Sequence, residues 1–120
     1  HPDAGIWPAS PRARSVARVL AAEMHAGFTA LRSHCPMNLR VSYTDCAPSA
    51  AVLADLARLQ AIWDWGRAQS GSAGPWLCGD YSAADVFFAP VAARIARWRS
   101  GGFAGTTPQS GKGSLGGEIF

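Results

Sequence analysis

Ser82, Asp85 and His25 are the residues of this chain whose types could combine into a catalytic group. A serine hydroxyl becomes a nucleophile when a histidine accepts its proton and a carboxylate orients that histidine. The Gly-x-Ser-x-Gly turn that presents such a serine in many hydrolases is absent around Ser82. We therefore predict no hydrolase triad and no catalytic residue in this chain.

Ser82 and Asp85 have the spacing of a helix N-terminal capping box. In such a box the serine hydroxyl accepts the Asp85 backbone N–H, and the Asp85 carboxylate accepts the Ser82 N–H. Tyr81 and Val86 occupy the two positions of a hydrophobic staple, one before the cap and four after it. Ser82 and Asp85 are therefore interpreted as structural residues at the start of a helix.

The helix behind this box is expected over residues 82–98. Its apolar residues recur at helical spacing, namely Val86, Phe87, Val91, Ile95 and Trp98. A helix that is so apolar and so well capped favours the central buried position in a bundle. Pro90 lies inside it and lacks a backbone N–H, so a kink is expected there.

A second helix is expected from Ser10, as the cap, and Pro11, at the first helical position, to about residue 33. Pro36 follows as a helix breaker. Gly27 inside this helix indicates either the close approach of another helix or room for a ligand. Its apolar face is formed by Val16, Leu20, Met24, Phe28, Leu31 and Cys35.

A third helix is expected from Pro48 to about residue 69, and Gly66 weakens its end. Its apolar stripe is Val52, Leu53, Leu56, Leu59, Ile62 and Trp63. Residues 36–48 are expected to form a loop that packs its apolar side chains beneath the bundle. These side chains are Met37, Leu39, Val41 and Tyr43. The predicted fold class is therefore all-α.

Two segments of the chain match motifs of one enzyme family. Residues 79–85, with the pattern Gly-x-x-Ser-x-Ala-Asp before an apolar helix, resemble the capping-box motif of the glutathione S-transferase C-terminal domain. Residues 23–28, Glu-Met-His-Ala-Gly-Phe, resemble the Glu-Leu-His-Lys-Gly-Phe segment on the first helix of that domain in bacterial beta-class enzymes. The segments stand in the family order and at about the family spacing. The resemblance covers roughly residues 1–97.

The resemblance implies a substrate-binding role for three residues. His25 corresponds to a helix histidine that faces the glutathione cleft, where it could hydrogen-bond the tripeptide or influence a thiolate. Met24 and Phe28 would be apolar walls of a pocket for a hydrophobic co-substrate. Ala26 replaces the family lysine, so any help from that positive charge is absent. A surface histidine without a catalytic duty, and plain core packing of Met24 and Phe28, remain the alternatives.

The resemblance also implies how the chain is organised. Residues 1–9 would be an interdomain linker, residues 10–100 an incomplete helical bundle of the glutathione S-transferase C-terminal type, and residues 101–120 a flexible or non-native Gly-rich tail. In the family, glutathione is a substrate that binds mainly to a thioredoxin-like domain, and this chain shows no pattern for that domain. We expect no cofactor and no activity from the chain alone.

The expected partners are glutathione and a hydrophobic electrophile, once the chain is joined to a thioredoxin-like domain, with a homodimer left open. The expected location is cytoplasmic. Two other functions remain open at this point. The chain could be a non-catalytic helical module that docks onto another protein, or an inactive truncated fragment.

Composition excludes several other classes of function. The net charge is only +3 and no run of Lys and Arg is present, so no nucleic-acid partner is expected. No apolar run approaches the roughly 18 residues that a membrane span needs. Cys35, Cys46 and Cys78 lack C-x-x-C spacing and a histidine at zinc-ligand spacing. We expect three reduced, semi-buried thiols and no metal site.

Two further anion-binding patterns were considered. Gly105, Gly111 and Lys112 look like a phosphate-binding loop, but five residues separate the glycines where that loop has four, so we reject it. Arg94 and Arg97 could bind a phosphate or a carboxylate, although a solvated or salt-bridged helix face is the default for such arginines.

Overall fold

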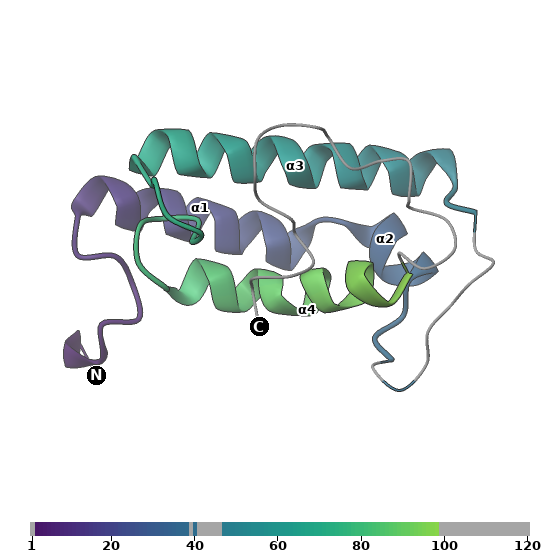
Figure 1. The fold of residues 1–120 in the computed structure, drawn as a ribbon, viewed down its shortest axis with the longest axis horizontal. Helices are drawn as coiled ribbons and strands as arrows, with labels where there is room; N and C mark the ends of the chain where they lie inside the picture. Colours follow the sequence, from purple (N-terminus) through teal and green to yellow (C-terminus); the bar gives the residue numbers. More distant parts are fainter. Residues whose placement is uncertain (1, 39, 41–46, 99–120) are drawn as a thin grey trace. The chain divides into compact units, whose positions relative to one another are not determined.

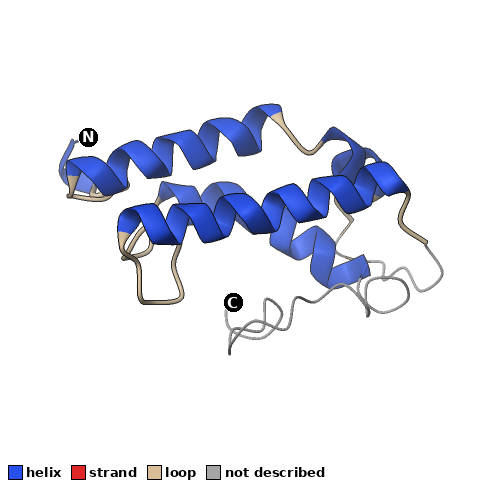
Figure 2. Ribbon diagram, turned by 90° about the horizontal axis from the view of Figure 1, so that it is seen from above, coloured by secondary structure: helices blue, strands red, loops and turns tan. Residues whose placement is uncertain are grey.

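A computed structural model describes residues 2–38, 40 and 47–98 of the protein; for residues 2, 97 and 98 it describes the backbone and not the side chains. Within these residues the chain forms a short 3-10 helix, Pro2–Ala4, and four α-helices (Figure 1). The α-helices are α1 (Pro11–Ala26), α2 (Thr29–His34), α3 (Ala50–Ser70) and α4 (Ala83–Trp98). The described part of the chain contains helices and loops but no strand, which confirms the all-α class (Figure 2).

The chain divides into two compact units. The first is formed by His1–Gly27 and Arg58–Ala89, and the second by Phe28–Ala57 and Pro90–Phe120. Helices α3 and α4 contribute residues to both units. Each unit has buried apolar side chains of its own, and each is described by itself below.

The buried side chains of the first unit come from α1, α3, α4 and the loop before α4. Trp63 and Phe88 meet edge to face, with ring centroids 5.6 Å apart. At Gly66 the backbone of α3 comes close to Leu20 of α1, because a Cβ atom there would lie 2.8 Å from Leu20 Cδ1. The larger members of this core are Val16, Leu20, Met24, Leu59, Ile62, Trp63, Leu77 and Phe88. The sequence analysis treated Gly66 only as a weak point, whereas the glycine allows this approach.

The second unit buries a smaller group of side chains. Leu31, Cys35 and Val91 are fully buried, and Val52 is nearly so. Phe28 is also buried in this unit. Helices α2, α3 and α4 each supply at least one of these residues, so the short helix α2 is part of the core rather than a surface turn.

The single helix predicted over residues 10–33 is in fact two helices. Helix α1 ends at Ala26, Gly27 is extended with φ −101° and ψ −170°, and Phe28 is left-handed with φ 59° and ψ 38°. A Cβ atom at Gly27 would lie 2.9 Å from the carbonyl oxygen of Glu23, which also accepts the Gly27 N–H. The glycine is therefore required by the end of its own helix, and the predicted close approach of another helix at this position is wrong.

Helix α1 begins at Pro11, as predicted, whereas α3 begins two residues later than predicted. Ser10 stands at the N-cap of α1, but its side chain makes no cap hydrogen bond. Helix α3 begins at Ala50, and its cap is Ser49 rather than Pro48. The Ser49 hydroxyl accepts the Val52 N–H at 3.3 Å.

The predicted buried face of α4 is confirmed at Val91 and wrong at Val86 and Phe87. Val86 and Phe87 are 49% and 42% exposed, whereas Ala84, Phe88 and Val91 are buried. Three apolar residues in succession, Val86-Phe87-Phe88, do not specify which of them faces inward, and the packed face follows positions 84, 88 and 91. Helix α4 is thus half-exposed at its start rather than buried all round.

Further apolar residues assigned to the core are also exposed. Leu53 on α3 is exposed, and so is Met37 in the loop after α2. The other loop residues predicted to pack, Leu39, Val41 and Tyr43, lie outside the described residues, as does the tail 101–120. Helix α4 continues through Pro90 as a single element.

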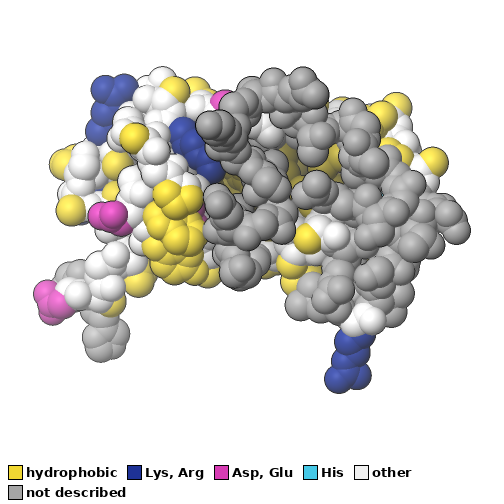
Figure 3. All heavy atoms as spheres, viewed as in Figure 1, with side chains coloured by type: hydrophobic (Ala, Val, Ile, Leu, Met, Phe, Trp, Pro, Cys, Tyr) yellow, Lys and Arg dark blue, Asp and Glu magenta, His cyan; other side chains and the backbone are white. Residues whose placement is uncertain are grey.

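In the view of Figure 1, hydrophobic side chains gather at the surface over the loop between α3 and α4 (Figure 3).

None of the helices in the described ranges combines the length and the apolar character that crossing a lipid bilayer requires.

Candidate functional site

The segment Glu23–Phe28, which carries the proposed substrate-binding residues, lies across the division between the two units. Glu23, Met24 and His25 are on the last turns of α1 in the first unit, and Phe28 begins the second. His25 is exposed. Of the three residues predicted to bind substrate, His25 is the exposed one, since Met24 and Phe28 are buried.

Met24 and Phe28 are both 5% exposed. Met24 belongs to the core of the first unit and Phe28 to that of the second. Their burial favours the packing alternative for both side chains. Neither one presents an apolar wall at the surface.

Glu23 has a structural partner that the sequence analysis missed. Its carboxylate oxygens accept the Arg58 Nε–H at 2.6 Å and an Nη2–H at 2.9 Å, a bidentate pair between α1 and α3 within the first unit. The hydrogen bond to Glu23 raises the pKa of Arg58 above its ordinary value. Arg58 lies 35 residues away, and no local spacing signals the pair. The glutamate of the matched segment therefore fixes the end of α1 next to His25.

The capping box at the start of α4 is formed, although not in the expected arrangement. Asp85 Oδ2 accepts the Ser82 N–H at 2.9 Å, as predicted. The Ser82 hydroxyl, however, donates to the same Oδ2 at 3.1 Å instead of accepting the Asp85 N–H. That N–H is bound by the Ser82 carbonyl at 3.0 Å. Ser82 is 4% exposed, and its hydroxyl is used for capping rather than presented as a nucleophile.

Asp85 also holds the loop in front of the helix. Its second oxygen, Oδ1, accepts the Leu77 N–H at 3.0 Å. The predicted staple is not buried, because Tyr81 is 58% and Val86 49% exposed. The Tyr81 ring instead meets Trp76 edge to face, at a centroid distance of 4.8 Å.

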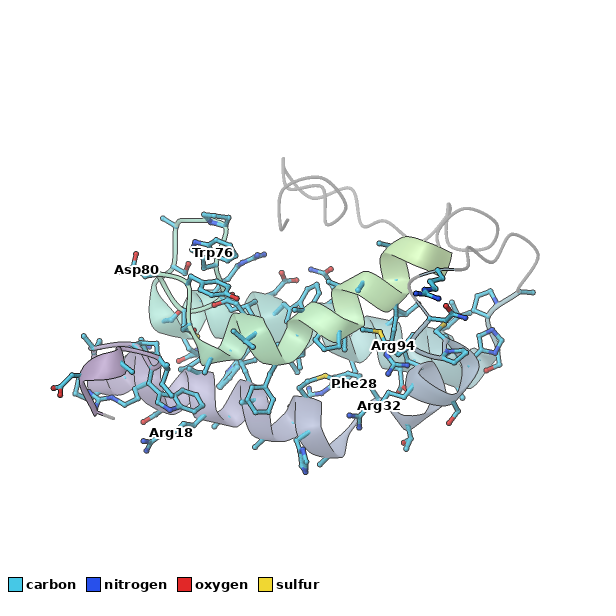
Figure 4. The ribbon with its side chains drawn as sticks, turned by 90° about the horizontal axis from the view of Figure 1, so that it is seen from below. Arg18, Phe28, Arg32, Trp76, Asp80 and Arg94 are labelled. Carbon is cyan, nitrogen blue, oxygen red and sulfur yellow. The ribbon has the colours of Figure 1, made fainter. Side chains whose placement is uncertain are left out.

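The same loop is fixed from α3 by side chains that donate to its carbonyl groups. Ser70 Oγ donates to the Leu77 carbonyl at 3.0 Å, and Arg67 Nη2 donates to that of Pro75 at 2.9 Å. Ser72 Oγ donates to the Trp76 carbonyl at 2.6 Å. Trp76 and Asp80 project from this ordered loop (Figure 4).

The two cysteines that can be described, Cys35 and Cys78, are both buried rather than semi-buried. Burial, together with the negative charge of Asp85, raises the pKa of the Cys78 thiol to about 11. A thiol with that pKa is protonated at neutral pH and is a poor nucleophile. Cys35 ends helix α2, and Cys46 lies outside the described residues.

Arg94, considered above as an anion-binding residue, hydrogen-bonds the backbone instead. Its Nη1 donates to the Cys35 carbonyl at 2.7 Å and, at 3.4 Å, to that of Arg32. Figure 4 shows Arg94, Arg32 and Phe28, all in the second unit. The side chain of Arg97 lies outside the described residues.

The described residues bring together no group of three or more His, Cys, Asp or Glu side chains suited to a metal ion. Comparison of the chain with protein-family models, with curated proteins and with solved structures finds no match.

Proposed function

We propose that this chain is the C-terminal helical part of a bacterial, beta-class-like glutathione S-transferase protein. It would contribute the hydrophobic co-substrate wall for the conjugation of glutathione to electrophiles. The observation that carries the proposal is the capping box, in which the Asp85 carboxylate accepts the Ser82 and Leu77 N–H groups at the start of a helix. The motif that resembles the family therefore has a structural reason to exist in this chain. The exposed position of His25, in the second matched segment, adds support.

The division of labour follows from the chemistry of thiol transfer. The glutathione thiol must become a thiolate, which requires groups that lower its pKa. In the resembled family these groups belong to the thioredoxin-like domain, which is built on a sheet, and the described residues of this chain form no strand. That domain would come from another segment or another chain, in the cytoplasm. His25 is then the residue placed to reach glutathione, and Met24 and Phe28 support the wall from within.

A second function, docking onto another protein, is favoured by one observation. Tyr81, Val86 and Phe87 are exposed at the start of α4, and Tyr81 contacts Trp76. Exposed aromatic side chains on an ordered loop are common features of protein interfaces. A docking module would use this surface without any dependence on glutathione.

Glutathione-affinity binding tests the first proposal. The chain joined to a thioredoxin-like domain should bind glutathione and conjugate it to a hydrophobic electrophile, and the isolated chain should do neither. His25→Ala in the joined protein should reduce conjugation. Ser15→Ala, which changes an exposed residue on the same helix, should not.

Two outcomes would contradict the proposal. Binding of glutathione by the isolated chain would place the tripeptide site in the wrong part of the protein. The docking function would be favoured if the joined protein bound a partner protein equally with and without glutathione and if Tyr81→Asp abolished that binding.

A further inference from the structure

Helix α2 is too short to be stable by itself. It has six residues, Thr29–His34, whereas isolated helices in water need roughly 12–15 to be even marginally stable. Its N-cap residue is Phe28, whose side chain has no oxygen to accept a backbone N–H. Two side chains from other helices supply what α2 lacks, one at each end.

The N-terminal end is capped by Asp55 of α3. Its Oδ2 accepts the Leu31 N–H at 2.9 Å. Leu31 is the third residue of α2, and its N–H is one of those that a normal N-cap side chain would bind. A carboxylate is also favoured at this end by the helix dipole.

The C-terminal end is capped by Arg94 of α4. Its guanidinium donates to the carbonyl groups of Arg32 and Cys35 at the last turn of the helix. The positive charge suits the negative end of the helix dipole. Asp55, α2 and Arg94 all belong to the second unit, so the arrangement is internal to it.

The turn before α2 requires a backbone conformation that is unfavourable for phenylalanine. Phe28 is the one non-glycine residue with positive φ in the described ranges, at φ 59°. A left-handed conformation costs roughly 1–2 kcal/mol for such a side chain and persists only where the surroundings impose it. In the second unit, this conformation is held by the burial of Phe28 and Leu31 and by the hydrogen bonds of the two remote caps.

We propose that Asp55 and Arg94 are positioning residues that together hold α2 and fix the left-handed turn at Phe28. They thereby define where the segment Glu23–Phe28 ends. A second part of the inference rests on the proposed function. Because Asp55 and Arg94 hold the turn at Phe28, they set the specificity of the wall for the electrophile without touching the substrate.

Backbone amide exchange of the intact chain tests the positioning itself. In Asp55→Ala and in Arg94→Met, the amides of α2 should exchange about tenfold faster, the change expected for the loss of one cap. The amides of Ile62 and Trp63, in the first unit, should change less. Asp64→Ala removes an exposed carboxylate from the same helix α3 and is the matched control.

Conservative variants keep this test decisive if the first variants fail to fold. Asp55→Asn retains an acceptor and Arg94→Lys retains a cation, so each should recover part of the protection of α2. Unchanged protection of the Leu31 amide in both Asp55→Ala and Arg94→Met would overturn the inference. Equal loss of protection throughout the chain in all four variants would also overturn it, because the effect would then be general instability.

Kinetics of the chain joined to a thioredoxin-like domain test the substrate part. Asp55→Asn and Arg94→Lys should raise the KM for the electrophile about threefold to tenfold and leave the KM for glutathione unchanged. An unchanged KM for the electrophile, with loosened α2, would overturn the substrate part alone. A wild-type joined protein with no conjugating activity would overturn the proposed function and with it this substrate part, while amide exchange would still decide the positioning.

Discussion

Helices α4 and α2 both begin at a carboxylate, but the two carboxylates come from different places. Asp85 belongs to α4 itself and lies three residues after the Ser82 that it caps. Asp55 belongs to α3 and lies 24 residues after the Leu31 whose N–H it accepts. The start of α4 can therefore form from a short stretch of chain, whereas the start of α2 requires that α3 has already packed against it.

The difference predicts where the structure is locally stable and where it depends on its surroundings. The α4 cap and the ordered loop in front of it share Asp85, so a single substitution should damage both. Helix α2 distributes its caps over two other helices, so each substitution there should loosen one end. Four sets of variants test this contrast.

Asp85→Ala should have the largest effect. It removes the acceptor of the Ser82 N–H, the Ser82 hydroxyl and the Leu77 N–H, all partly buried. We expect the free energy of unfolding to fall by about 2–4 kcal/mol, as measured by urea denaturation. Asp80→Ala, which removes an exposed carboxylate five residues earlier, should change it by less than about 0.5 kcal/mol. An equal loss of unfolding free energy in Asp85→Ala and Asp80→Ala would mean that the hydrogen bonds of Asp85 do not stabilise the start of α4.

Gly27→Ala should come next. The added Cβ would meet the Glu23 carbonyl oxygen at 2.9 Å, and that oxygen is fixed by the helix backbone. A loss of about 1–2 kcal/mol is expected in thermal or urea unfolding. Gly74→Ala is the control, because its Cβ would find its nearest neighbour at an ordinary 3.9 Å. A stabilised Gly27→Ala protein would mean that α1 and α2 can join into one helix, as the sequence pattern predicts.

Ser82→Ala and Ser10→Ala form a matched pair, since both serines stand at the N-cap of a helix. The buried Ser82 hydroxyl donates to Asp85, and its removal should cost about 1 kcal/mol. The Ser10 side chain makes no cap hydrogen bond, so its removal should leave the free energy of unfolding nearly unchanged. A larger loss of unfolding free energy in Ser10→Ala than in Ser82→Ala would contradict the hydrogen bonding described for these two serines.

The same contrast explains how much of the molecule is predictable from sequence. The α4 cap is predictable because Ser82 and Asp85 are close in the chain, and helix content is predictable from apolar periodicity. The remote pairs, Asp55 with Leu31 and Glu23 with Arg58, leave no local pattern, because each forms only when two helices pack. For that physical reason the sequence alone does not predict these two pairs.

The candidate site divides in the same way. Exposure of His25 fits the role that the matched segment suggests, and burial of Met24 and Phe28 is the core packing that their place on the apolar stripe indicates. A single stripe cannot indicate that the helix breaks at Phe28, because the left-handed turn there is imposed by packing.

Cys78 offers a test that depends on pH, because the effect of its ionisation is absent at neutral pH and appears only in alkaline solution. Burial and the charge of Asp85 raise the pKa of its thiol from 9.0 to about 11 in the folded protein. Between these values the unfolded chain loses the thiol proton and the folded chain retains it, so the unfolded chain binds fewer protons. Stability should therefore be unaffected below about pH 9 and should decline as the pH rises from about 9 to about 11.

Cys78→Ala isolates this contribution from other groups that titrate in the same range. Urea denaturation at pH 8.5 and at pH 10.5 should show a smaller loss of stability in the variant than in the wild type. Asp85→Asn should reduce the same pH dependence in part, because it removes the charge that opposes the thiolate but leaves Cys78 buried. An identical pH dependence in wild type and Cys78→Ala would mean that the loop opens before the thiol ionises, and the start of α4 would then be less rigid than its hydrogen bonds indicate.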